Sequence, residues 1–134
     1  MDYVADTTFL VGLWRRQAWA VNFAQENAAK SLGLPWVVLG EFKHGALRAG
    51  HEPADVENFL RIGFPMLDPL PAIPVYARLC SQHRDTGVYR EVGQNDLWIG
   101  ASAIAAGRPL RTRNRRHFDK MDGLELVVLD SSSR

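Results

Sequence analysis

The sequence lacks the features that would place it in a specialised class of protein. Its one cysteine, Cys80, has no partner for an internal disulfide or a cysteine zinc site, which fits a reducing compartment. No apolar run reaches the roughly 18 residues that a membrane span needs. The first residues, MDYVADTT, carry acids and no basic segment before an apolar stretch, so no signal peptide is expected. We therefore expect a cytoplasmic protein.

The chain also lacks an excess of either charge. Its 16 Lys and Arg residues nearly balance 15 Asp and Glu residues, giving a net charge of +1. Affinity for nucleic acid would therefore have to come from a local basic patch. What remains is an ordinary globular composition, 46% hydrophobic and 23% charged. A length of 134 residues predicts one domain, residues 1–134.

Short apolar runs alternate with longer amphipathic segments. The pattern predicts strands at residues 3–5, 36–39, 66–67, 109–112 and 124–129. It predicts helices near residues 9–14, 17–32, 53–63, 74–84 and 96–106, and another that starts near Gly40. Residues 90–94 are predicted as a loop. Strands separated by helices indicate an α/β fold with a central, mostly parallel β-sheet flanked by helices on both faces.

Three carboxylates, Asp6, Glu41 and Asp96, stand where an apolar run meets a helix. Each has a simpler explanation by itself, because Asp6 and Asp96 can cap a helix and Glu41 suits the first turn of one. Their shared place at the carboxyl edge of the predicted sheet favours a joint role. Carboxylates gathered there would repel one another unless a divalent cation lay between them, and oxygen is the ligand that Mg²⁺ prefers. The pattern indicates a metal-dependent nuclease.

Four segments, in this order and spacing, resemble the PIN-domain ribonucleases, and most closely the small VapC-type toxins of bacterial toxin–antitoxin pairs. The segments hold Asp6 and Thr7 after the first strand, Glu41 in GEFKHG, Asp96 in NDLWIGASAIAAG, and Thr112, Arg113 and Asn114 before Phe118. The resemblance covers residues 3–129. No single motif is specific, but their combination is.

The resemblance implies a PIN-like fold and an endoribonuclease that depends on Mg²⁺ or Mn²⁺. Such an enzyme would cleave cellular RNA such as tRNA. A metal-activated water would attack the phosphodiester. Its metal ligands would be Asp6, Glu41 and Asp96, with Asn114 completing the catalytic set. Thr7 and Thr112 would donate oxygens or orient the acids. Further implications are a homodimer and inhibition by a cognate VapB-type antitoxin, with a hetero-oligomer formed by the two.

The sequence departs from the family at the fourth acidic position. Asn114 stands where the family often has an acid, and His117 stands at a nearby position that is sometimes acidic. An amide adds no negative charge, which leaves open whether one or two metal ions bind. Asp119 is a possible substitute, although its place after Phe118 is typical of a surface residue. The segment 85–95 holds two acids and a tyrosine, and its role is left open.

Basic residues are dense between positions 108 and 120. Arg111, Arg113, Arg115 and Arg116 form either a phosphate-contacting rim, a contact for an acidic antitoxin segment, or a solvated face. The four histidines, His44, His51, His83 and His117, lack zinc-ligand spacing. The four tryptophans, Trp14, Trp19, Trp36 and Trp98, favour core or interface positions over base stacking, and Trp14 and Trp19 suit a dimer or antitoxin surface.

Two other functions remain open. One is a PIN nuclease with a housekeeping or DNA-directed role. The other is a catalytically impaired binding protein, which the amide at Asn114 makes conceivable. Metal-dependent cleavage of RNA discriminates between an enzyme and a binding protein.

Overall fold

The computed structural model describes residues 1–129 of the chain. Within that range the strands form one five-stranded parallel sheet in the order β3-β2-β1-β4-β5. The strands are β1 (Tyr3–Ala5), β2 (Leu32–Pro35), β3 (Phe64–Met66), β4 (Leu110–Thr112) and β5 (Leu126–Val128). The predicted α/β class with a mostly parallel sheet is confirmed.

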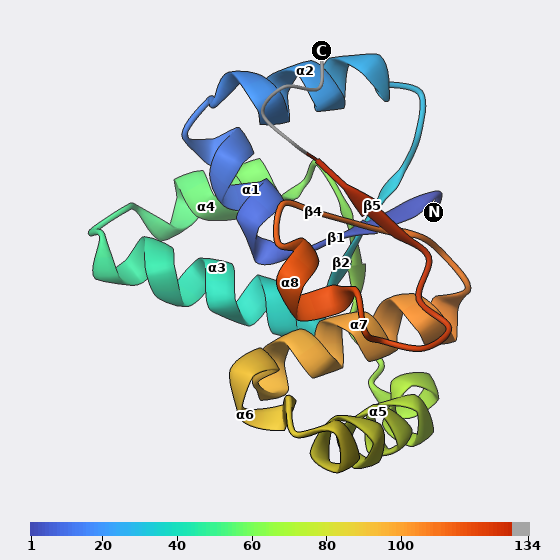
Figure 1. Ribbon diagram of the computed structural model, residues 1–134. Coiled ribbons are helices and arrows are strands. Elements are labelled where there is room, and N and C mark those ends of the chain that lie inside the picture. Colours follow the sequence, from blue (N-terminus) through green and yellow to red (C-terminus); the bar gives the residue numbers. More distant parts are fainter. Residues whose placement is uncertain (130–134) are drawn as a thin grey trace.

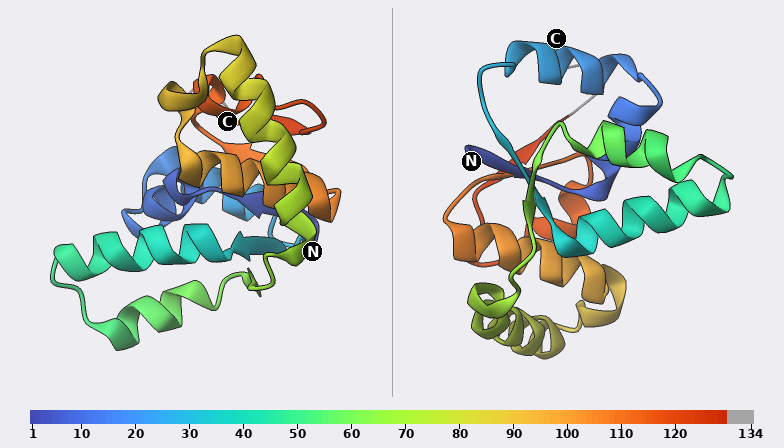
Figure 2. Two further views of the ribbon diagram at one scale, coloured as in Figure 1. Left: turned by 90° about the horizontal axis from the view of Figure 1, so that it is seen from below. Right: turned by 180° about the vertical axis from the view of Figure 1, so that it is seen from behind.

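Helices connect consecutive strands, as a parallel sheet requires. They are α1 (Thr7–Trp14), α2 (Ala18–Glu26), α3 (Trp36–Arg48), α4 (Pro53–Leu60), α5 (Ile73–Thr86), α6 (Tyr89–Val92), α7 (Gln94–Ala106) and α8 (Arg115–Phe118), with a short 3₁₀ helix, η1 (Leu70–Ala72), before α5. Figures 1 and 2 show α1 and α2 on one side of the sheet and α7 with α5 on the other. Both faces are therefore covered, and every residue of β1 and β2 is buried.

The structure corrects the predicted strand at residues 36–39. Residues 32–35 form β2 instead, and α3 begins at Trp36 directly after the strand. The run Trp36 to Leu39 is rich in β-branched and aromatic residues, which favours a strand locally. Its burial comes from helix packing, because Val37 and Val38 lie on the inward side of α3. Glu41 therefore lies in the second turn of α3 and not in the first.

The predicted loop at residues 90–94 is also wrong. Residues Tyr89–Val92 form α6, and Gln94 already belongs to α7. A single helical turn is too short to show the 3.6-residue periodicity that identifies a helix in a sequence. The predicted helices 53–63, 74–84 and 96–106 correspond to α4, α5 and α7.

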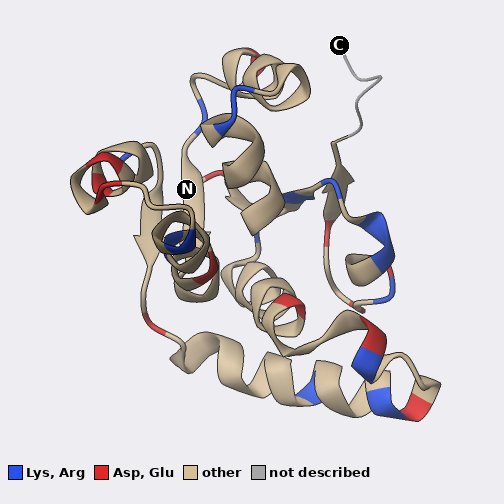
Figure 3. Ribbon diagram, turned by 90° about the vertical axis from the view of Figure 1, so that its left-hand side faces the viewer, with Lys and Arg blue, Asp and Glu red and all other residues tan. Residues whose placement is uncertain are grey.

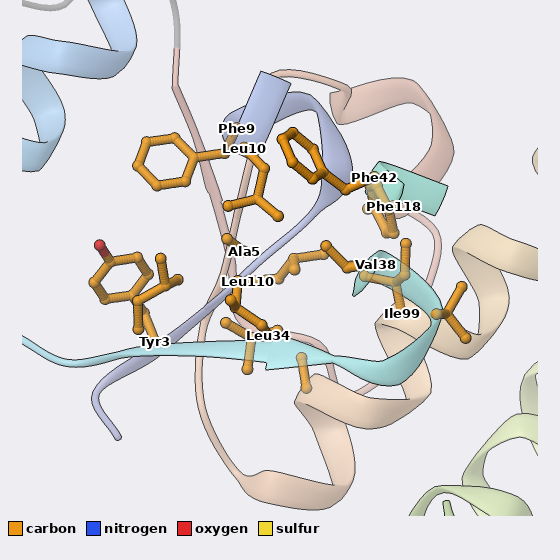
Figure 4. Packing of buried hydrophobic residues seen from close by; sticks show 14 of the residues in the cluster. Tyr3, Ala5, Phe9, Leu10, Leu34, Val38, Phe42, Ile99, Leu110 and Phe118 are labelled. Atoms are coloured by element: carbon orange, nitrogen blue, oxygen red, sulfur yellow. The ribbon is translucent and has the colours of Figure 1, made fainter. Parts of the chain in front are cut away.

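The core lies between β1 and the helices on either side of it. Figure 4 shows Phe9 and Leu10 of α1 packed near Leu110 of β4 and Val38 of α3. Phe9, Leu10 and Leu110 are fully buried. This packing fixes the start of α1, and therefore Asp6, against the ends of β1 and β4. In the described part of the chain, no helix is long and apolar enough to cross a membrane.

The strand order places a topological switch point between β1 and β4. From β1 the chain moves outward to β2 and β3, and then returns to place β4 on the opposite side of β1. Ligand sites of open parallel sheets lie beyond the carboxyl ends of the strands at such a point. Asp6 follows β1 immediately, and Thr112 is the last residue of β4.

Candidate active site

Asp6 is the buried centre of the site. Only 3% of its surface is exposed. One carboxylate oxygen accepts hydrogen bonds from the Thr8 hydroxyl (2.7 Å) and from the Phe9 backbone N–H (3.2 Å), which makes Asp6 the N-cap of α1. The capping explanation raised from the sequence is therefore correct, but it accounts for only one of the two oxygens.

The second oxygen of Asp6 faces β4. It accepts a hydrogen bond from the hydroxyl of Thr112, which is completely buried. The same hydroxyl oxygen accepts the backbone N–H of Asn114 at 2.9 Å. Thr112 thus joins the carboxyl end of β1 to the chain after β4, and it orients the carboxylate as expected from the sequence. Asn114 lies next to this bridge, at the N-cap of α8.

Glu41 approaches the site from α3 and is held between two donors. The Thr7 hydroxyl donates to Oε1 at 2.5 Å, and the Asn95 side-chain amide donates to Oε2 at 2.9 Å. These bonds connect α1, α3 and α7 over sequence separations of 34 and 54 residues. Thr7 therefore positions Glu41, the acid on the neighbouring helix.

Asp96 lies in the first turn of α7 and pairs with His117. The distance between Asp96 Oδ2 and His117 Nδ1 is 2.5 Å, and 23% of the aspartate side chain and 29% of the histidine side chain are exposed. Gly93 is the N-cap residue of α7, so Asp96 does not cap this helix. Position 117, where the sequence departs from the family, is thus in direct contact with an acid of the site.

The three acids influence one another electrostatically. The pKa of Asp6 is raised to about 6, mainly by burial and in smaller part by the charge of Asp96, against the lowering effect of its hydrogen bonds. Burial also raises the pKa of Asp96, partly offset by His117, and Glu41 adds to the rise. Asp96 is therefore coupled to both other acids, which makes the structure consistent with a single cluster at the carboxyl edge.

Their chemistry fits a hard divalent cation that keeps part of its water shell. Among residues 1–129, no three His, Cys, Asp or Glu side chains lie close enough together to enclose a metal ion by themselves. Mg²⁺ typically takes one or two carboxylates and completes its octahedron with waters and substrate phosphate. Burial is the main cause of the raised pKa of Asp6 and of Asp96, and repulsion between the acids adds a smaller part, which a bound cation would relieve. The candidate ligand atoms are carboxylate, hydroxyl and amide oxygens, with the His117 imidazole beside Asp96.

The arginines in and after β4 have separate surroundings. Arg111 packs its guanidinium on Tyr3 and Phe23, and Arg113 lies over Trp19. Arg116 forms an ion pair with Glu91 at 2.7 Å, whereas Arg115 is exposed. Figure 3 shows Lys and Arg spread over several elements of the fold. Asp119 is exposed as expected, and it follows α8 directly.

Sequence reasoning did not find three polar partners of the acids: Thr8, Asn95 and His117. A Thr two residues after a capping Asp is a recognisable turn pattern. The contacts of Asn95 and His117 depend on tertiary structure, and nothing in the sequence pattern indicates them. Among the other histidines, His83 is buried, with its Nδ1 2.9 Å from the Leu79 carbonyl oxygen of the preceding helical turn.

The fold belongs to the PIN-like α/β class, and solved structures share it over almost the whole chain. A chain of the VapBC2 complex from Rickettsia felis, solved with a DNA fragment of its promoter, has a TM-score of 0.83 at 22% identity, covering 97% of this chain and 100% of that one. A chain of VapBC-1 from nontypeable Haemophilus influenzae has a TM-score of 0.81 at 18% identity, covering 96% of this chain and 98% of that one.

A toxin–antitoxin complex from Klebsiella pneumoniae gives a TM-score of 0.76 at 18% identity, covering 96% of this chain and 98% of that one. No protein-family model and no curated protein matches the sequence. The likeness confirms the fold that the four sequence segments implied.

Proposed function

We propose that this protein is a metal-dependent endoribonuclease that acts as the toxin of a toxin–antitoxin pair. The observation that carries the proposal is the set of coupled acids Asp6, Glu41 and Asp96 at the switch point of the sheet, where Asp6 is buried and its pKa is raised to about 6. A buried carboxylate with a perturbed pKa in this position is typical of a functional site. Fold likeness to chains of toxin–antitoxin complexes supports the toxin assignment.

In the proposed mechanism Asp6, Glu41 and Asp96 would offer carboxylate oxygens to Mg²⁺ or Mn²⁺, and waters and substrate phosphate would complete the metal's shell. Asn114 would stand where the family often has a fourth acid. When bound, the ion supplies an activated water as nucleophile and offsets negative charge on the scissile phosphodiester. Thr112 and Thr8 fix the rotation of the Asp6 carboxylate through its two oxygens. Thr7 and Asn95 do the same for Glu41. The chain's own contribution is therefore a set of oxygen ligands whose directions are fixed before substrate binds.

The proposed substrate is a cellular RNA such as tRNA, and the proposed partners are a VapB-type antitoxin and a second copy of the chain in a homodimer. Arg113 and Arg115 are both exposed, and we propose them as contacts for RNA or for an acidic antitoxin segment. Arg111 and Arg116 already contact Tyr3 and Glu91, so either would have to leave that partner in order to bind RNA.

RNA cleavage with and without a divalent ion tests the proposal. Purified protein is incubated with total bacterial RNA in Mg²⁺, in Mn²⁺ and in EDTA, beside Asp96→Asn and the control Asp2→Asn, which changes an exposed acid at the other end of β1. We expect discrete cleavage by wild type and Asp2→Asn in either metal, and none in EDTA or with Asp96→Asn. Expression in bacteria should arrest growth with the same variant pattern. No cleavage under any condition would contradict the nuclease and favour a binding protein.

A further inference from the structure

A cleft of about 450 Å³ opens directly beside the acids. It is lined by Thr7, Thr8, Val11, Arg15, Gln17, Trp19 and Arg113. Two of these residues contact the site, because Thr7 donates to Glu41 and Thr8 donates to Asp6. A molecule in the cleft would therefore lie next to the carboxylates, and the proposed mechanism assigns the cleft no ligand.

The charge of the cleft is positive. Arg15 and Arg113 are both exposed, and within the described residues that line the cleft there is no acid. Arg15 also lines a neighbouring hollow of about 350 Å³, which contains Glu41. Arg15 therefore borders both the cleft and the hollow beside Glu41, a position from which its guanidinium can contact a phosphate of a bound nucleic acid.

Arg113 and Trp19 form one wall of the cleft, the Arg113–Trp19 platform. The Arg113 guanidinium lies over the Trp19 indole, with 4.5 Å between its central carbon and the ring centroid. The indole is pressed against α1 at Gly12, where a Cβ atom would lie 2.5 Å from the Trp19 ring. The absence of a side chain at Gly12 thus permits the close approach that fixes the ring. The guanidinium is itself planar, so Arg113 beside the indole offers the cleft a cation on which a base can stack.

The turn between α1 and α2 supplies the remaining polar group. Arg16 in this turn has a φ of 55°, a left-handed conformation that costs a non-glycine residue free energy. The Trp19 indole N–H donates to the Gln17 side-chain oxygen at 2.9 Å. That bond leaves the Gln17 amide N–H groups available to an acceptor in the cleft.

We propose that this cleft, the Trp19 cleft, binds one unpaired nucleotide of the RNA substrate adjacent to the scissile phosphate. The base stacks on the Arg113–Trp19 platform, Arg15 contacts the phosphate, and Gln17 donates to the base edge. The proposal rests on the proposed function, since it places the nucleotide relative to the acids. It gives Trp19 a stacking role that differs from the core or interface role favoured by the sequence.

Single-stranded RNA fits these features better than a protein segment does. Proteins bind unpaired bases on aromatic rings and on arginine planes, and they add cations for the backbone. The cleft has both, because Arg113 lies over the Trp19 ring and Arg15 supplies a second cation. An unpaired nucleotide presents its base to the platform and its phosphate to Arg15 at the same time.

Binding of a fluorescein-labelled single-stranded RNA decamer, followed by anisotropy in EDTA, tests the proposal without requiring cleavage. We expect Arg113→Ala and Trp19→Leu to weaken binding by about 10-fold, within the range measured for loss of one base stack. Trp19→Phe keeps an aromatic surface and should lose less than Trp19→Leu. Arg113→Ala should also reduce the slope of log affinity against log salt by about 1.

The matched control is Arg61→Ala, which removes one exposed arginine that lines neither the Trp19 cleft nor the hollow beside Glu41. It should lower the affinity less than Arg113→Ala does, and circular dichroism confirms that each variant is folded. Equal affinity of wild type, Arg113→Ala and Trp19→Leu for the decamer overturns the proposed subsite. If metal-dependent cleavage persists in that case, the proposed function stands and only the subsite fails.

The subsite is also overturned if Arg113→Ala and Trp19→Leu weaken binding of a protein partner but leave the affinity for RNA unchanged. The cleft would then be the binding site of that partner. Wild-type protein that neither binds the decamer nor cleaves RNA overturns the subsite and the proposed function together.

Discussion

Two aspartates flank strand β1, and their surroundings differ in the properties that set the pKa of a carboxyl group. Asp2, before the strand, is exposed and accepts the Ser31 backbone N–H at 2.7 Å. That hydrogen bond lowers the pKa of Asp2. Asp6, after the strand, is buried, and burial raises its pKa to about 6 although it accepts three hydrogen bonds. The charge of Asp96 adds to the rise.

The charged form of Asp2 stabilises the folded protein, whereas the charged form of Asp6 destabilises it. Ionised Asp2 is favoured in the folded protein, as is usual for a solvated acid with a backbone donor. Ionised Asp6 is disfavoured, and its hydrogen bonds only partly compensate. Groups that break the local rules of stability are expected at functional sites. The acids at the carboxyl end of the sheet are therefore the ones to which we assign the chemistry.

The largest expected effect is on RNA cleavage. Asp6→Asn removes a charge that would hold the metal ion, so we expect the rate in Mg²⁺ or Mn²⁺ to fall at least about 100-fold. Asp2→Asn, at the other end of the same strand, should leave the rate unchanged. Initial rates on a defined RNA, with the two variants side by side, check this. An equal fall in the cleavage rate of Asp6→Asn and Asp2→Asn would contradict the assignment of the chemistry to the acid at the carboxyl end of β1.

The next effect concerns stability as a function of pH, measured by urea unfolding in EDTA. The folded protein binds a proton at Asp6 more tightly than the unfolded chain does, since the pKa rises from 3.8 to about 6. The stabilisation from protonated Asp6 is thus full below about pH 4 and is lost as the pH rises through 6. That difference in pKa corresponds to about 3 kcal/mol. The free energy of unfolding of Asp6→Asn, measured relative to that of wild type, should therefore rise by about 3 kcal/mol between pH 4 and pH 7.

Asp2 should behave in the opposite sense. Its pKa is lowered in the folded protein, so its contribution is present above about pH 4 and is lost as the pH falls further. Asp2→Asn should therefore lose stability relative to wild type at pH 7 but not at pH 2. If the two variants instead follow wild type in parallel over the whole pH range, the electrostatic contrast between Asp2 and Asp6 does not exist.

The smallest expected effect is on the free energy of unfolding when the hydroxyl donors to Asp6 and Asp2, at the two ends of β1, are removed. Thr112→Val keeps the shape of a buried side chain but deprives Asp6 and the Asn114 N–H of their shared hydroxyl. We expect a loss of about 1–3 kcal/mol in the free energy of unfolding. Ser31→Ala removes an exposed hydroxyl near Asp2 and leaves the backbone donor in place, so it should cost less than about 0.5 kcal/mol. Chemical denaturation at pH 7 measures both.

The fold class could be predicted from the sequence because it depends on local patterns, and the same patterns single out the three acids as candidates. Apolar runs and helix starts are visible along the chain, and parallel strands bring their carboxyl ends to one edge. The position of β2 was missed because Trp36 to Leu39 has strand propensity, whereas its burial belongs to the helix α3. Local propensity cannot show which neighbour will bury a segment.

The partners of the acids were harder to predict. Asn95 reaches Glu41 across 54 residues, and His117 reaches Asp96 across 21. Such contacts exist only after α3, α7 and α8 have packed together. The stacking of Arg113 on Trp19 is of the same kind, because it joins the segment after β4 to α2. Short-range patterns therefore located the acids and left their surroundings to the structure.

Direct measurement of metal binding tests the central claim, that the acids at the carboxyl edge form a divalent-cation site. Mn²⁺ is titrated into wild type, Asp6→Asn, Asp96→Asn and Asp2→Asn, and free Mn²⁺ is followed by electron paramagnetic resonance. We expect wild type and Asp2→Asn to bind Mn²⁺ with the same affinity, and the other two variants to lose most of it. Equal Mn²⁺ affinity in all four proteins, or no binding by wild type, would contradict the claim.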